Sequence, residues 1–100
     1  MSKTHYQHPG GILKRMFLDE YGMTVGAAAK ATGMTRARLN EITRGERNVT
    51  ADTALRLAAL FGNSAQFWMS LQSHYDLAQA EAKAGKALSK IQAVEIRAAP

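Results

Sequence analysis

The 100-residue chain predicts an all-α bundle of five helices in a single domain. Apolar residues recur at helical spacing, and no segment alternates between apolar and polar residues for long. Threonine or serine precedes several of these segments and glycine follows them, which is how helices commonly begin and end. Hydrophobic residues make up 46% of the chain and charged residues 21%, as is ordinary for a globular domain with a modest core.

The first helix is predicted from Pro9, which suits a first helical position, to about Glu20. Gly22 is expected to stop it. Four apolar residues fall at helical spacing within it, and we expect them to face inward together: Ile12, Leu13, Met16 and Phe17.

Residues 24–50 predict two short helices joined by a tight turn, the layout of a helix-turn-helix. Thr24 is placed to cap a helix over residues 25–32, and Thr35 to cap a second helix that runs to about Arg44. Ala28 and Ala29 are small enough for the two helices to approach closely. Glycine marks the turn and the end of the second helix, at Gly33 and Gly45.

Two further helices complete the bundle. Thr50 is expected to cap the fourth, with Asp52 in its first turn, and Gly62 to end it; its predicted buried face is Leu55, Ala58, Leu60 and Phe61. Ser64 is expected to cap the fifth, whose apolar surface is Phe67, Trp68, Leu71 and Tyr75. Residues 1–8 are predicted to form a loose arm, residues 9–77 the domain, and the alanine-rich residues 78–100 a helical or frayed tail.

The second helix of the motif carries arginine on one side, which predicts binding in the major groove of DNA. Leu39 and Ile42 are expected to face the core. Arg36 could then pair with the O6 and N7 atoms of guanine, and Asn40 could read adenine or hold a phosphate. Ala37 offers a methyl contact to thymine. The residues expected at the DNA backbone are Thr35, Arg38, Arg44, Arg47 and Asn48.

The global charge of +5 and the sequence pI of about 9.9 agree with a polyanionic partner. Cysteine is absent, so disulfides and thiolate metal sites are excluded. No apolar run approaches the length of a membrane span, and no signal-peptide core is present, so we expect a soluble, cytoplasmic protein.

Other interpretations of these residues remain open. An arginine-bearing helix is often only a solvated face, and Asn40 and Glu41 could simply pair locally along the helix. No further metal-ligating residues accompany the three histidines in the sequence. We therefore expect His5, His8 and His74 to be ordinary surface residues and not to form a metal site. The sequence shows no nucleophile–base pair, glycine-rich phosphate loop or convergent carboxylates, so we expect neither an enzyme nor a cofactor.

Three segments resemble the HigA-type antitoxins of the Xre/lambda-repressor-like group, some of which are called virulence-associated protein I. They are HPGGILK at 8–14, RLNEITRGERNVTADTALRLAALFG at 38–62 and FWMSLQSHYDL at 67–77. The chain departs from the group in Gly26, in the alanines of the first motif helix and in Ala37, where relatives often carry a polar residue.

The resemblance implies a five-helix lambda-repressor-like fold and a homodimer that binds a palindromic operator in double-stranded DNA of its own promoter. It also implies a partner toxin, a small RelE-like RNase. By matching position, Arg36 and Ala37 would begin the base-reading helix. The residues placed near backbone or bases would be Thr24, Thr35, Arg38, Asn40, Arg44 and Arg47. The alternative is a stand-alone Xre-family regulator or a protein-interaction module without a toxin.

Overall fold

The computed structural model describes residues 7–95, which form helices and their connections with no strand among them. Because α1 runs directly into the π-helical segment η1, the two make one first helix, and the prediction of a five-helix, all-α fold is confirmed. The elements in chain order are α1 (Pro9–Ile12), η1 (Leu13–Leu18), α2 (Val25–Thr32), α3 (Arg36–Thr43), α4 (Ala51–Phe61) and α5 (Ala65–Ser89).

Helix ends lie where the capping residues predict them. The side chains of Thr24, Thr35, Thr50 and Ser64 each accept a hydrogen bond from the backbone amide three residues later. Such a bond satisfies one of the amides that a helix start leaves unpaired. Gly33 and Gly62 end α2 and α4 with φ angles of +74° and +70°, in the left-handed region that favours glycine.

The first helix departs from its predicted buried face at one of the four residues, Met16. The Asp19 amide donates to the Lys14 carbonyl at 2.9 Å, so the turn closes over five residues instead of four. Residues five apart therefore share a face, and Leu13 and Leu18 are the buried pair. Met16 is 64% exposed, so its predicted inward position is wrong. Ile12 and Phe17 lie half-buried.

Of the residues predicted to form the buried face of α4, Ala58, Leu60 and Phe61 are half-buried and pack against the core, and only Leu55 is misplaced. Thr53, Ala54 and Leu57 are buried, and Leu55 lies 63% exposed on the opposite side. Thr53 holds a core position despite its hydroxyl, because that hydroxyl accepts a 2.5 Å hydrogen bond from Arg38 on α3. Because its hydroxyl has a hydrogen-bond partner, Thr53 can be buried at a position that hydrophobicity alone would leave exposed.

Trp68 on α5 is fully buried and is the largest side chain of the core. Its indole Nε1 donates to Asn63 Oδ1 at 2.9 Å, so burial leaves no orphaned donor. Phe17 lies 4.9 Å from the Trp68 ring, between centroids, and Phe67 packs on the edge of the cluster, 38% exposed. The rest of the core is aliphatic: Leu13, Leu18, Ala28, Ala29, Met34, Leu39, Ile42, Val49, Ala54 and Leu57.

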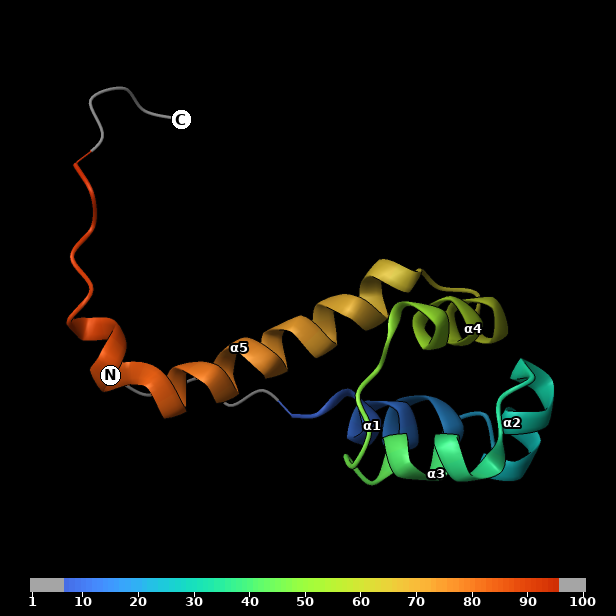
Figure 1. Ribbon diagram of the computed structural model, residues 1–100. Helices are drawn as coiled ribbons and strands as arrows, with labels where there is room; N and C mark the ends of the chain where they lie inside the picture. Colours follow the sequence, from blue (N-terminus) through green and yellow to red (C-terminus); the bar gives the residue numbers. More distant parts are fainter. Residues whose placement is uncertain (1–6, 96–100) are drawn as a thin grey trace.

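Figure 1 shows α5 beginning beside α4 and then running away from the other helices. It continues through Gly85 to Ser89 as one helix, and its outer half carries exposed Leu77 and Leu88. No helix within residues 7–95 combines the length and the apolar character needed to cross a bilayer.

The predicted loose arm lies mostly outside the described residues, as does His5. His8 is not an ordinary surface residue. Its Nδ1 accepts a hydrogen bond from the Gly10 amide at 2.9 Å and caps α1, and its ring packs edge-on against Tyr75 of α5, 5.1 Å between centroids. Gln7 accepts a hydrogen bond from Arg15.

Candidate nucleic-acid interface

The position of α3 is set by its buried side. Leu39 and Ile42 are both 0% exposed. Successive residues of an α-helix are 100° apart, so four residues lie on the opposite, outward side: Ala37, Asn40, Glu41 and Arg44. Arg36 lies exposed on one flank of this side, and Arg38 on the other flank toward α4.

Arg36 lies across the start of α2. A methyl group built on Gly26 would meet the Arg36 Nε and Cζ atoms at 3.8 Å, which is ordinary contact. The guanidinium has no ion-pair partner among residues 7–95. Arg36 is therefore supported by α2 and keeps its charged group available.

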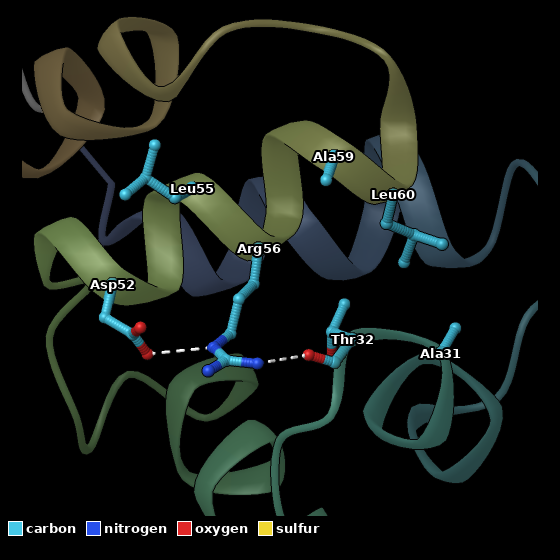
Figure 2. A pocket seen from close by; sticks show the side chains of 7 residues that line it. All are labelled: Ala31, Thr32, Asp52, Leu55, Arg56, Ala59 and Leu60. Atoms are coloured by element: carbon cyan, nitrogen blue, oxygen red, sulfur yellow. Dashed lines mark hydrogen bonds and ion pairs between the residues drawn. The ribbon is translucent and has the colours of Figure 1, made fainter.

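Arg38 is already engaged in a network that ties three helices together. Its Nη2 contacts Asp52 Oδ2 at 3.0 Å, and the same oxygen accepts from Arg56 Nε at 3.0 Å. Arg56 Nη1 donates to the Thr32 carbonyl at 2.8 Å, as Figure 2 shows. Hydrogen bonds from Arg38, and then from Arg56, lower the pKa of Asp52 below its ordinary value near 3.8. Asp52 thus joins α4 to α3 directly and to the end of α2 through Arg56.

A shallow groove of about 530 Å³ lies beside this network, between α4 and the end of α2. Figure 2 shows Asp52, Leu55, Arg56, Ala59 and Leu60 along α4, with Arg56 in the middle reaching across to Thr32 at the end of α2. The two charged groups satisfy each other, so the groove offers no uncompensated charge to a ligand.

The loop after α3 is held from both sides. Arg47 Nε contacts Glu41 Oε1 on α3 at 2.7 Å, and Arg44 Nη2 contacts Glu46 Oε1 at 3.1 Å. From α5, the buried Gln72 accepts a 2.7 Å hydrogen bond from the Val49 amide. The chain between α3 and α4 is therefore ordered relative to the outward side of α3.

The family described as helix-turn-helix matches residues 13–68. Virulence-associated protein I of Dichelobacter nodosus is 49% identical over 74 residues, which are 74% of this chain and 68% of that protein. The antitoxin HigA of Pseudomonas aeruginosa, solved with the higBA promoter, is 41% identical to this chain with a TM-score of 0.87. The match covers 91% of this chain and 100% of that one. Antitoxin GraA, solved in complex with its operator, is 33% identical with a TM-score of 0.87, over 96% of this chain and 98% of that one.

The chain belongs to the HigA-type branch of the helix-turn-helix family.

In this HigA-type chain the interface carries less net charge than its arginines suggest. Three of the four arginines predicted there are each bonded to a carboxylate: Arg38 to Asp52, Arg44 to Glu46 and Arg47 to Glu41. Arg56 shares Asp52 with Arg38, so five arginines and three carboxylates leave a local formal charge of two positive units, and more than half of the overall +5 lies elsewhere.

The structure brings most of the predicted site residues onto α3 and the loop that follows it. Those exposed to solvent are Thr24, Thr35, Arg36, Ala37, Arg44, Arg47 and Asn48, and Asn40 and Arg38 are half-buried. Thr24 lies apart from α3, as the cap of α2.

Sequence reasoning treated Glu41 only as a local partner, although its position four residues after Ala37 and three before Arg44 places it on the outward side of α3. The bonds from Arg38 to Asp52 and from the Val49 amide to Gln72 carried no signal in the sequence, because they join residues fourteen and twenty-three positions apart.

Proposed function

We propose that this chain is a DNA-binding repressor that binds operator DNA as a dimer, with α3 in the major groove. The observation that carries the proposal is the outward side of α3, held rigid by buried Leu39 and Ile42 and flanked by available Arg36. Two relatives of closely similar fold were solved with promoter or operator DNA, which supports the same partner here. Such a repressor acts in the cytoplasm and needs no catalytic site.

Base reading is assigned to the exposed start of α3. Arg36 is the donor for guanine, Asn40 reads adenine or holds a phosphate, and Ala37 meets a thymine methyl group. The backbone contacts are assigned to Thr24, Thr35, Arg38, Arg44, Arg47 and Asn48. Of these, Arg38 must keep or exchange its bond to Asp52 when a phosphate approaches.

Dimerisation is supported by the outer half of α5. Leu77 and Leu88 are 60% and 48% exposed, and Ile91 beyond the helix is 70% exposed. Residues four, seven and eleven positions apart lie on one side of a helix, so Leu77, Ala84 and Leu88 form an apolar stripe with the exposed Glu81 beside it. A second copy packed along this stripe would give a two-fold dimer, which supplies the two recognition helices that a palindromic operator requires.

The antitoxin function rests on the family. HigA and GraA are named antitoxins, and we extend that function to this chain with a RelE-like RNase as the toxin. Acidic side chains such as Asp19 and Asp76 could attract a basic toxin, but Asp19 pairs with Lys14 at 2.5 Å and Asp76 accepts a hydrogen bond from Gln72. We therefore expect shape and apolar contact to dominate toxin binding, with weak salt dependence.

An electrophoretic shift assay tests the DNA-binding part. The protein should bind its own upstream DNA in preference to random DNA at physiological salt, and log K should fall by about 0.9 per phosphate contact against log salt. Equal affinity for both DNAs would contradict the repressor function.

Co-expression tests the antitoxin part. A small adjacent reading frame should stop growth when expressed alone, and this chain should restore it. If no such frame exists, or if it is harmless, the chain is a stand-alone regulator, and the DNA-binding part is unaffected.

A further inference from the structure

A carboxylate occupies the side of α3 that the proposed function places against DNA. Glu41 lies between Ala37 and Arg44 on the outward side, and its side chain is 36% exposed. An unpaired carboxylate there would be repelled by phosphates. Glu41 is bonded instead to Arg47, which reaches it from the loop after α3.

The geometry of this contact leaves the rest of the arginine available. Only the Nε atom of Arg47 meets Glu41 Oε1, at 2.7 Å. Within residues 7–95 the two terminal nitrogens of Arg47 make no hydrogen bond or ion pair, and the side chain is 51% exposed. Arg44 differs, because a terminal nitrogen meets Glu46 only two residues away.

We propose that Glu41 is a positioning residue of the DNA interface: it holds the Arg47 side chain against α3 and leaves the terminal nitrogens free for a phosphate. The proposal rests on the proposed function. An arginine side chain carries rotamer entropy that a phosphate contact must otherwise overcome, and the planar guanidinium binds oxygens best when it is already oriented. The bond from Nε supplies that orientation before DNA arrives.

The backbone on both sides of the contact is held in place. Glu41 is anchored through its neighbour Ile42, which is fully buried. Arg47 is two residues before Val49, whose amide is bound by buried Gln72. The Glu41–Arg47 bond therefore joins two points whose backbone is already fixed, and it orders only the side chain.

A charge-matched pair of variants tests the proposal. Glu41→Gln and Glu41→Ala both remove the negative charge, but only glutamine keeps an oxygen that can accept from Arg47 Nε. We expect Glu41→Gln to bind the upstream DNA about two- to ten-fold more tightly than Glu41→Ala. In an Arg47→Ala background this difference should vanish. Glu20→Gln and Glu20→Ala, at an exposed site in the turn after η1, are the matched controls and should bind alike.

Each other outcome overturns the proposal. Equal affinity of the two Glu41 variants shows that orientation of Arg47 contributes nothing. A difference that persists without Arg47 shows that residue 41 contacts DNA directly, for example by accepting from cytosine N4. These results are distinct from failure of the proposed function, in which the unaltered chain itself shows no preference for its upstream DNA.

Discussion

A methyl group at residue 10 tests how closely α1 packs against α3. An alanine Cβ there would lie 1.7 Å from the Ile42 carbonyl oxygen and 2.8 Å from its carbon. That is half of the 3.4 Å at which ordinary contact begins, and the obstructing atoms are backbone. Overpacking a core costs about 1–3 kcal/mol when side chains can yield. Because the Ile42 backbone cannot yield alone, we expect Gly10→Ala to cost about 3 kcal/mol or more.

Urea unfolding followed by circular dichroism measures this cost. A loss of about 3 kcal/mol corresponds to a fall in Tm of roughly 12–24 °C for a domain of this size. Gly85→Ala is the control, because nothing lies within 4 Å of its Cβ; removing a helical glycine there should raise stability by about 0.5–1 kcal/mol. If Gly10→Ala stays within about 0.5 kcal/mol of the unaltered chain, α1 does not pack closely on the Ile42 backbone of α3.

Substitutions of four side chains, Gln72, His8, Arg36 and Arg47, test other contacts. Gln72→Leu leaves the buried Val49 amide without an acceptor and should cost about 1–3 kcal/mol in urea unfolding, whereas Gln66→Leu on the exposed side of α5 should cost little; equal effects would refute the contact. Burial lowers the pKa of His8 below its ordinary 6.5, outweighing the opposing effects of Asn48, the Arg47 backbone and Asp76. The folded state therefore disfavours the charged ring, so the stability from His8 is complete above about pH 6.5 and is lost as pH falls toward the lowered pKa. His8→Asn, which can still cap α1 but does not titrate, should flatten this slope between about pH 7 and 5, and an unchanged slope would assign it to another group. Arg36→Ala should cost about 1–3 kcal/mol on the operator and flatten discrimination at one base pair, whereas Arg47→Ala should weaken operator and random DNA alike; a uniform loss from both would make Arg36 a phosphate contact.

Helix boundaries could be predicted from the sequence because their signals are local. Thr24 and Thr35 accept bonds from amides only three residues away, so a cap can be recognised without knowing the fold. Gly33 similarly ends α2 by its own φ angle. The outward side of α3 followed from Leu39 and Ile42, since two buried residues on a helix determine where the opposite side lies.

The errors arose where the fold overrides local pattern. The bond from Asp19 to Lys14 widens the first helix, and this moves Met16 out of the core. Leu55 is exposed because α4 instead buries Thr53, whose hydroxyl binds Arg38. The Arg38–Thr53 bond joins residues fifteen positions apart, whose proximity only the folded chain establishes. The pairing of the interface arginines with Glu41, Glu46 and Asp52 was likewise invisible in a count of basic residues.

Footprinting on the chain's own upstream DNA tests most directly whether α3 reads the major groove as part of a dimer. Two protected half-sites should appear, with centres roughly one helical turn, about 10–10.5 base pairs, or a multiple of it apart. Methylation of guanine N7 within each half-site should block binding, and Arg36→Ala should remove that sensitivity at one position. A single protected half-site, or binding that is indifferent to guanine N7 methylation, would contradict the account.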